Sequence, residues 1–516
     1  MSHSPHRQRL AAALAGLGCV AWLALPAPVF AQQDVQDQLP ELGSAGSATL
    51  SIEDEYRLGR MVMRSVRESG ALIEDPETTE YIQSLGLRLS SLAHDGNRDF
   101  TFFVIGDRAI NAFALPGGFI GVHSGLVLET ATESELAGVL AHEVAHVTQR
   151  HIARGIEARS RTNLVSTAAM LAAILLGAAA GGGSDVTMGA ISAAQGLAAQ
   201  AQINYTRDNE YEADRVGIGI LGGAGYDPIA MARFFETMAR RTQLGPDQMP
   251  ELLRTHPVSS NRMAEARARA AQMPPGSNGD QVTYALVKER LRVLGTKAGE
   301  DPRSHYAGVD PDSPDTSIAQ VYGIAVAATR AGVPQDAVRL LERLRAAQPE
   351  VLLFHTALGE AQLAAGDTRA ALDTLERARE LAPRNVPVTV RYGEALLRAS
   401  RPKRAHEVLL DLFNNVPPTP EQVRLTALAA NSAGDVADAY SYMAEYHVMA
   451  GDLPLAINQL ELALSVPNIS AVQRARFGAR LNELRQNLPR ERPRLQKSNE
   501  PPPGRGVATA QSAAHW

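Results

Sequence analysis

The sequence predicts a mostly α-helical protein: a helix-rich amino-terminal domain that holds a small β-sheet, followed by an α-solenoid of helical hairpins. Two observations predict this fold class. Apolar residues recur at helical spacing from residue 52 to 89 and give way to short extended patterns between 100 and 123. The second half repeats itself every 34 residues, a period at which helical hairpins stack on one another.

The composition excludes one class of function. The chain has 516 residues, of which 21% are charged, and a formal net charge of −6. These values are typical of a protein with two or three ordinary domains. Because there is no excess of lysine and arginine to follow a phosphate backbone, we expect no nucleic-acid partner.

The first 31 residues have the pattern of a secretory signal. Two arginines precede an apolar run that ends in small residues at Ala31. Cleavage there would remove Cys19, the one cysteine of the chain, and a protein without thiols suits an oxidising compartment. We therefore expect export to a bacterial periplasm, with a flexible linker over 32–50. A membrane anchor is the alternative, although two prolines interrupt the apolar run.

We expect the first domain over residues 51–298, and short sequence patterns predict the order of its helices and strands. The stretch "SIEDEYRLGRMVMRSV" begins with Ser51 and Asp54 at capping distance and continues as a helix. "FTFFVIGD" at 100–107 is typical of a strand, and "INAFALPGGFIGVHSGLV" indicates two short strands around a Pro-Gly-Gly turn.

Residues 164–203 are almost free of charge. Their apolar part, 164–180, is only about as long as the shortest membrane span. We interpret them as a buried helical hairpin packed against the domain core, with an element that touches the membrane or gates access of the substrate as the alternative.

The stretch "AHEVAH" carries the chemistry of this domain. His142 and His146 are four residues apart, so on a helix they can direct a ring nitrogen at one cation. Glu143 lies beside them and can act on a water at that cation. Thr132 and Glu135 offer a capping box upstream, which supports the helix.

A catalytic zinc needs a third protein ligand, and the stretch "RDNEYEADRVG" offers carboxylates for it. Glu210 and Asp214 share a helix face, whereas Glu212 points away from that face. One carboxylate on the metal and a second one holding a ligand histidine is the expected arrangement.

The second half has the tetratricopeptide signature, in which helical hairpins form a curved solenoid with a concave binding face. Turn residues recur 34 positions apart, at Gly332, Gly366, Ser400 and Gly434. We expect the repeats over 316–488, after a linker at 299–315. A further copy at 444–467 is 17 residues out of phase, which suggests an additional helix. The tail 489–516 is polar and proline-rich, and we expect it to be disordered.

"HEVAH" followed by "EYEAD" resembles the gluzincin metalloproteases of the CaaX-prenyl-protease and HtpX type, over roughly residues 50–290. The resemblance extends to "NAFALPGG", which looks like the family's edge strand, and to "THPVSSNR". It implies one zinc ion per subunit, with His142, His146 and Glu210 as ligands, Glu143 as general base and Asp214 orienting a ligand histidine.

The resemblance also implies roles for residues outside the two motifs. His256 matches a histidine near the metal, which either stabilises the oxyanion or occupies the open metal position and holds the enzyme off. Arg262 matches a basic residue of the same site. A capping histidine and a surface arginine remain the alternatives. A substrate strand is expected to pair with the backbone of Asn111, Ala112, Phe113, Ala114 and Leu115, beside Gly117 and Gly118.

Together, the secretory signal, the protease motifs and the repeats imply a periplasmic zinc endopeptidase. The resemblance implies that its clients are misfolded or stalled outer-membrane proteins, whose assembly it could also assist, and we expect the repeats to dock these clients or their assembly machinery. Peripheral association with the outer membrane stays open. The alternatives are a non-proteolytic envelope chaperone with a structural metal site and an integral membrane metalloprotease that uses 164–203 as a span.

Overall fold

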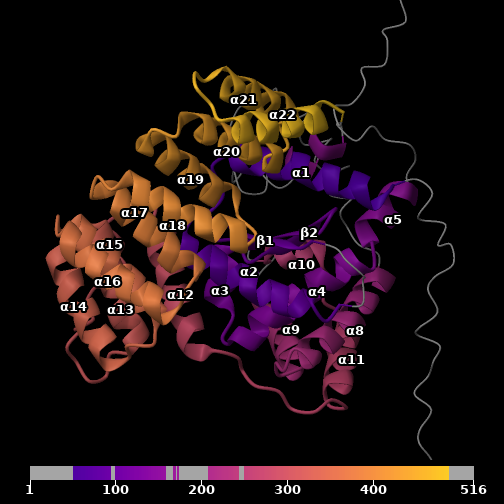
Figure 1. Ribbon diagram of the computed structural model, residues 1–516. Coiled ribbons are helices and arrows are strands. Elements are labelled where there is room, and N and C mark those ends of the chain that lie inside the picture. Colours follow the sequence, from indigo (N-terminus) through magenta and orange to yellow (C-terminus); the bar gives the residue numbers. More distant parts are fainter. Residues whose placement is uncertain are drawn as a thin grey trace, which may run out of the picture. The chain divides into compact units, whose positions relative to one another are not determined.

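The computed structural model describes residues 50–93, 99–158, 167–169, 171–173, 207–242 and 249–486 (Figure 1). The expected secretory signal, nearly all of the linker at 32–50, most of 164–203 and the tail at 489–516 lie outside these residues. Within the described ranges, no helix combines the length and the apolar character that crossing a membrane requires.

Two capped helices open the described chain. Helix α1 (Ile52–Glu68) begins after Ser51, whose side chain accepts a hydrogen bond from the backbone N–H of Asp54, as the sequence predicts. Helix α2 (Pro76–Ser90) begins after Asp75, whose side chain accepts from Thr78 N–H.

A three-stranded sheet follows, formed by β1 (Thr101–Ile105), β2 (Ala112–Leu115) and β3 (Phe119–His123). The strand order is β1-β3-β2, and β3 is parallel to β1 and antiparallel to β2, so the expected hairpin is present. Alternate residues face opposite sides. One face joins the core formed with α2 and α4, and the other packs on α1 and on the described part of 164–203 around Leu171.

The other helices of the first domain build around α4. They are α3 (Ser124–Glu129), α4 (Glu133–Thr148), α5 (His151–Ala158), α8 (Arg207–Gly223), α9 (Ile229–Thr242), α10 (Glu251–Thr255), α11 (Ser260–Ala270) and α12 (Gln281–Leu294). Thr132 caps α4 by accepting from Glu135 N–H, while the Glu135 carboxylate accepts from Ala131 N–H. Since α4 is buried from Glu133 to Val147, its polar side chains must find partners inside the protein.

The repeats form a stack of antiparallel helices, shown in orange to yellow in Figure 1. They are α13 (Ile318–Arg330), α14 (Pro334–Ala347), α15 (Leu352–Ala364), α16 (Thr368–Leu381), α17 (Val386–Arg398), α18 (Pro402–Asn415), α19 (Pro420–Ala433), α20 (Val436–Met449), α21 (Leu453–Ser465) and α22 (Ala471–Gln486). The fold class predicted from the sequence is confirmed.

The turns explain the 34-residue period. Gly332, Gly366, Ser400 and Gly434 all have a positive φ, of 80°, 83°, 57° and 93°. Each turn therefore needs the left-handed conformation that favours glycine. The copy at 444–467 covers the end of α20 and all of α21, and its turn at Gly451, with a φ of 82°, lies one helix after the turn at Gly434. The stretch 299–315 contains a short 3-10 helix, η4 (Pro302–Tyr306), and Tyr306 is buried.

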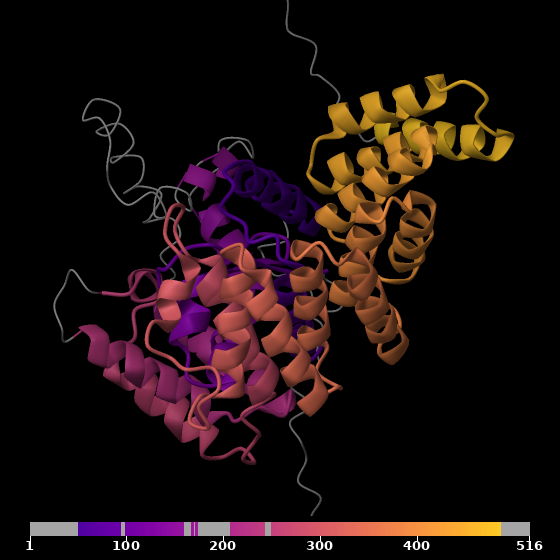
Figure 2. The same ribbon diagram turned by 90° about the vertical axis from the view of Figure 1, so that its left-hand side faces the viewer.

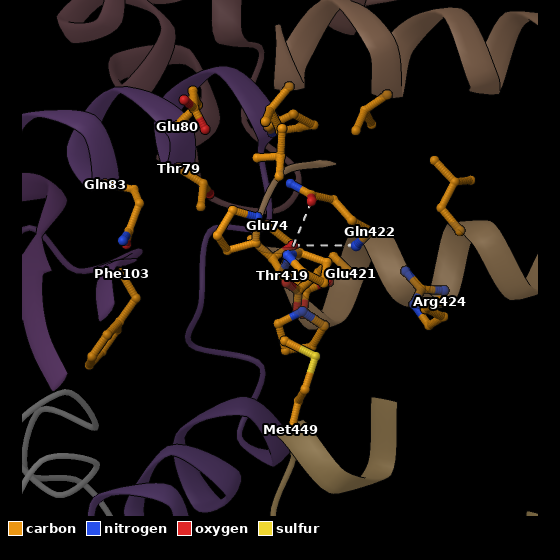
Figure 3. Close-up of a pocket in the computed structure, with 18 of the residues that line it drawn as sticks. Glu74, Thr79, Glu80, Gln83, Phe103, Thr419, Glu421, Gln422, Arg424 and Met449 are labelled. Carbon is orange, nitrogen blue, oxygen red and sulfur yellow. Dashed lines mark hydrogen bonds between the residues drawn. The ribbon is translucent and has the colours of Figure 1, made fainter. Parts of the chain in front are cut away.

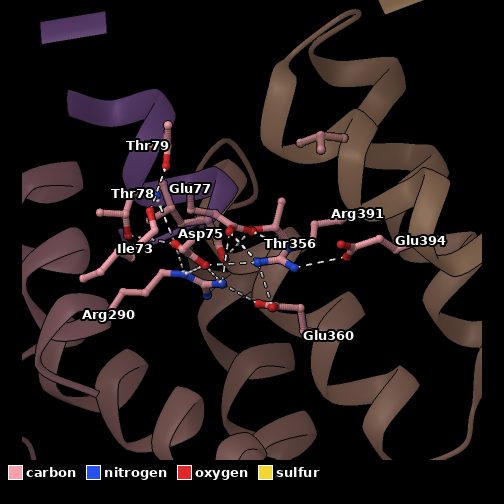
Figure 4. A network of polar contacts seen from close by, with 12 residues as sticks. Ile73, Asp75, Glu77, Thr78, Thr79, Arg290, Thr356, Glu360, Arg391 and Glu394 are labelled. Carbon is pink, nitrogen blue, oxygen red and sulfur yellow. Dashed lines mark hydrogen bonds and ion pairs between the residues drawn. The ribbon is translucent and has the colours of Figure 1, made fainter. Parts of the chain in front are cut away.

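The repeats lie beside the first domain (Figure 2), and a buried charge cluster joins the two (Figure 4). Asp75, the cap of α2, accepts hydrogen bonds from Arg290 of α12, with Nη2 2.7 Å from Oδ2. Arg391 of α17 lies 3.1 Å from the same Asp75 oxygen and 2.7 Å from Glu77 Oε2. Glu360 of α15 pairs with both arginines, at 2.9 Å each. The start of α2 is therefore held from both halves of the chain.

Candidate metal centre

Helix α4 places three functional side chains in the domain interior. His142 and His146 lie one turn apart, and their Nε2 atoms are 3.0 Å from each other. Glu143 follows His142 on the helix and is fully buried. The sequence predicts this arrangement from the four-residue spacing.

Helix α8 supplies a carboxylate to the same point. Glu210 Oε1 is 3.4 Å from His146 Nε2, and Glu210 Oε2 is 3.6 Å from His142 Nε2. The two helices approach closely because Gly217 of α8 lies against the backbone of His142.

His256 completes the cluster from the end of α10. Its Nδ1 is 3.0 Å from Glu210 Oε1 and 3.3 Å from His142 Nε2. Its Nε2 is 3.5 Å from Glu143 Oε1. His256 is the C-cap residue of α10, and its side chain is buried among the other three candidate ligands and not exposed at the surface.

The four residues fit a tetrahedral cation site. Ligand atoms about 2.0–2.1 Å from a zinc ion are about 3.3 Å apart at tetrahedral angles. Five separations among His142 Nε2, His146 Nε2, the two Glu210 carboxylate oxygens and His256 Nδ1 run from 3.0 to 3.6 Å, and one ligand atom from each of the four residues lies within 4.8 Å of the others. Two or three imidazoles with one carboxylate are also the donor set that zinc prefers.

Asp214 and Arg262 hold this cluster from behind. Asp214 Oδ1 is 3.0 Å from His142 Nδ1, on the ring side opposite the cluster. Arg262 donates to Asp214 through Nε and Nη2, at 2.7 Å each, and its Nη1 is 2.7 Å from Glu210 Oε2. Arg262 is 2% exposed, so it is a buried clamp on two carboxylates.

The charges of the cluster shift its pKa values. Burial alone would raise the pKa of Glu210, but the neighbouring histidines hold it well below its usual range. Burial also opposes a charge on His142, yet Asp214 and Glu210 raise the pKa of His142 to about 10. Asp214 and Glu210 therefore favour a positive charge at His142.

Glu143 differs from the other buried acids. Among the residues that the structure describes, neither of its oxygens has a hydrogen-bond partner. A buried carboxylate without a partner is costly, and such groups are frequent at sites of chemistry. The position beside the cluster leaves this carboxylate available as a base.

The candidate substrate segment lies at the edge of the sheet. Ala112, Phe113, Ala114 and Leu115 form β2, the outer strand beyond β3, and they are buried. Asn111 precedes β2, and its buried Oδ1 has no hydrogen-bond partner in the described part of the chain. Gly117 and Gly118 form the turn after β2, where a Cβ would overlap the backbone of Tyr56 and of Asp99, respectively.

Two polar residues beside the cluster escape sequence reasoning. His151 Nδ1 lies 2.8 Å from His146 Nδ1, and His151 Nε2 lies 3.0 Å from Glu212 Oε2. The sequence predicts that Glu212 points away from the helix face of Glu210. In the structure Glu212 does so, and its carboxylate contacts His151 on that other face. A third histidine five residues after His146 was the available signal.

Helices around a small sheet, with two histidines and a carboxylate converging inside, define the class of a metalloprotease, and comparisons with known proteins agree. Residues 76–270 match a family model described as Peptidase family M48, and 362–430 match one described as Tetratricopeptide repeat. The chain is 34% identical to the beta-barrel assembly-enhancing protease of Escherichia coli (strain K12) over 473 residues, which covers 90% of this chain and 95% of that one.

Two further relatives define the extent of the similarity. A putative beta-barrel assembly-enhancing protease of Vibrio cholerae is 34% identical over 479 residues and covers 90% of this chain and 95% of its own. Metalloprotease LoiP of Escherichia coli (strain K12) is 29% identical over 198 residues, 38% of this chain and 72% of its own. The chain therefore belongs to the family of beta-barrel assembly-enhancing proteases.

Proposed function

We propose that this metalloprotease is a zinc-dependent endopeptidase of the bacterial periplasm that cleaves misfolded or stalled outer-membrane proteins. The observation that carries the proposal is the set of separations of 3.0–3.6 Å among His142, His146, Glu210 and His256. The names of the relatives support a role in outer-membrane assembly. Each subunit would bind one zinc ion through His142, His146 and Glu210.

Each residue of the centre has a task in peptide hydrolysis. Bound there, zinc supplies a Lewis acid that polarises the scissile carbonyl and acidifies a water. Glu143, whose carboxylate oxygens accept no hydrogen bond from the residues that the structure describes, would take a proton from the attacking water and deliver it to the departing amine. Asp214 and Arg262 keep the ring of His142 and the Glu210 carboxylate in place.

His256 is proposed to be an inhibitory fourth ligand in this state. Its Nδ1 lies at ligand spacing from His142 and Glu210, where a substrate carbonyl would have to bind. A shift of the chain at the end of α10 would remove His256 and open that position. The alternative role, oxyanion stabilisation, needs His256 to stay near the metal without binding it.

The substrate is proposed to bind as an extended strand beside β2. An edge strand can pair with a peptide through main-chain hydrogen bonds, and Asn111 Oδ1, which has no hydrogen-bond partner among the described residues, adds an acceptor at the start of this edge. An unfolded polypeptide suits such an edge, whereas a folded surface cannot supply a free strand.

The repeats are proposed to dock the client, and a pocket between them and the first domain is the candidate place (Figure 3). This pocket has a volume of about 1000 Å³ and is lined from α1, α2 and β1 on one side and from α17, α19 and α20 on the other. The Gln83 side chain accepts a hydrogen bond from the backbone N–H of Phe102 and donates one to the carbonyl of Phe100, so these β1 groups are not available to a client. A client would therefore be held mainly by side-chain contacts.

Metal analysis and cleavage of casein by the purified chain test the proposal together. Wild type should contain one zinc ion and cleave casein, and chelation should remove the activity. Glu143→Gln should keep the zinc and lose about 10²–10⁴-fold in rate, because only the base is missing. Full cellular function of Glu143→Gln would instead favour a chaperone with a structural metal.

The cellular location is a separate part of the proposal. Release of the protein with the periplasmic fraction would support export. Washing membranes with carbonate distinguishes the remaining possibilities, because a peripherally bound protein is released and an integral one is not.

A further inference from the structure

A second set of polar residues lies behind the metal cluster, on the side of His146. His151 Nδ1 is 2.8 Å from His146 Nδ1, and its Nε2 is 3.0 Å from Glu212 Oε2. Glu212 also accepts from Arg154 Nη2 at 2.9 Å. The His151 side chain is fully buried, whereas that of Glu212 is 30% exposed. The chain of contacts therefore runs from the interior to the surface.

The backbone between α4 and α5 brings His151 to this position. Helix α4 ends at Thr148, and Arg150 has a positive φ of 53°, which reverses the chain before α5 starts at His151. Arg150 is held in this conformation by Glu55 Oε1, 2.8 Å from its Nε, and by the carbonyl of Leu50. A left-handed arginine is uncommon, and these contacts offset its conformational cost.

If His146 binds a cation, one arrangement of protons follows for its contact with His151 and for the contact of His151 with Glu212. His146 Nε2 faces His142 and Glu210, so it must carry a lone pair for a cation, and its proton is on Nδ1. That N–H then donates to His151 Nδ1, which must be bare. The remaining proton of His151 is on Nε2 and donates to Glu212, a carboxylate that only accepts.

The two ligand histidines are thus supported in different ways. His142 Nδ1 is backed directly by Asp214, at 3.0 Å. His146 Nδ1 is also linked to a carboxylate, that of Glu212, but through the intervening ring of His151. We propose that His151 and Glu212 are positioning residues that fix the tautomer and ring orientation of His146 for metal binding. The inference rests on the proposed zinc site and extends it to residues that do not touch the metal.

The zinc affinity of the full-length chain tests this His146–His151–Glu212 relay directly. It is measured by competition with a chromophoric chelator after the bound metal has been removed. His151→Phe keeps a ring but removes the acceptor for His146, so the zinc Kd should rise by about 10–100-fold. His151→Asn restores an acceptor near the Nδ1 position and should recover part of this loss. Glu212→Ala should weaken binding less than His151→Phe, since His151 remains.

Matched controls separate the relay from general loss of packing. His355→Phe replaces another buried histidine, in the repeats, and should leave the zinc Kd unchanged. Glu265→Ala removes another carboxylate of an arginine pair, that with Arg269, and should do the same. At saturating zinc, casein cleavage by His151→Asn should keep the wild-type KM.

The outcomes distinguish this inference from the proposed function. Wild-type zinc affinity in His151→Phe and Glu212→Ala would overturn the relay and leave the zinc protease intact. Absence of zinc binding by the wild type would overturn the proposed site itself. If His151→Phe does not fold, as judged by circular dichroism, Glu212→Ala, at a partly exposed position, and the polar His151→Asn still decide the question.

Discussion

Gly217 of α8 lies directly against His142 of α4: a Cβ at Gly217 would be 3.1 Å from both the Cα and the backbone nitrogen of His142. This contact sets how closely the helix that carries Glu210 approaches the helix that carries the two histidines. The geometry of the metal centre thus depends on a residue that makes no polar contact with it.

Gly217→Ala should lower zinc affinity by several-fold. The added methyl group would have to displace backbone and would move Glu210 away from His142 and His146. Gly219→Ala, in the same helix with open space around it, should bind zinc normally and be about 1 kcal/mol more stable. Chelator competition measures the affinity, and equal affinity of the two variants would contradict this explanation.

His256→Ala should raise the rate of casein cleavage. The variant removes a nitrogen that lies at ligand spacing from His142 and Glu210, so the substrate carbonyl no longer competes with it. His305→Ala, at an exposed histidine, serves as the control. Unchanged or lost activity in His256→Ala would reject inhibition and favour a role in oxyanion stabilisation.

Arg262→Lys should weaken zinc binding by about tenfold or more and lower the temperature of thermal unfolding. A lysine cannot make the paired bonds to Asp214 together with the contact to Glu210. Arg267→Lys, also on α11 but 61% exposed at its side chain, should have little effect on either measurement. Wild-type affinity in Arg262→Lys would show that the charge alone suffices.

Asp75→Asn should destabilise the protein at pH 7 by about 3 kcal/mol or more and have a smaller effect near pH 3. Burial opposes the charge of Asp75, but Arg290 and Arg391 hold its pKa well below its ordinary value of 3.8. The ionised carboxylate therefore stabilises the folded state above pH 3.8, and this contribution disappears as the pH falls toward the folded pKa.

Asparagine can still cap α2, so this variant isolates the charge. Asp367→Asn, at the exposed cap of α16, is the matched control and should show no such pH dependence. Thermal unfolding followed at several pH values measures both, and a gap from wild type that does not narrow in acid would contradict the prediction.

Leu428→Glu should reduce cross-linking of an unfolded outer-membrane protein to the chain. Leu428 lines the pocket between α19 and the first domain and is 53% exposed. Leu381→Glu alters a leucine of similar exposure, 60%, that does not line this pocket. Equal cross-linking yields in the two variants would place the docking surface elsewhere.

The features that the sequence predicted well are local. The cap at Ser51, the pair of histidines on α4 and the turn at Gly366 each depend on residues within a few positions of one another. Such signals act through hydrogen bonds and backbone conformations that a short window contains. The 34-residue period adds a constraint that holds over the whole second half.

The features that escaped prediction depend on contacts between distant segments. Asp75 and Arg391 are separated by 316 positions, and no periodicity relates an acid at the start of one helix to an arginine in a repeat. His151 was missed because its contact with His146 requires the reversed backbone at Arg150. For Arg262, the choice between a surface residue and a buried clamp needed the position of α11.

Asp75 and Glu77 form ion pairs with arginines of both the first domain and the repeats, and this limits where the chain can be truncated. A shortened gene ending at residue 298 would keep Arg290 but delete Arg391. It would leave Glu77 without one of its two cations, and the start of α2 would face solvent where α17 now covers it. Anyone preparing a minimal catalytic fragment should therefore either extend it through α17 or neutralise Glu77 first.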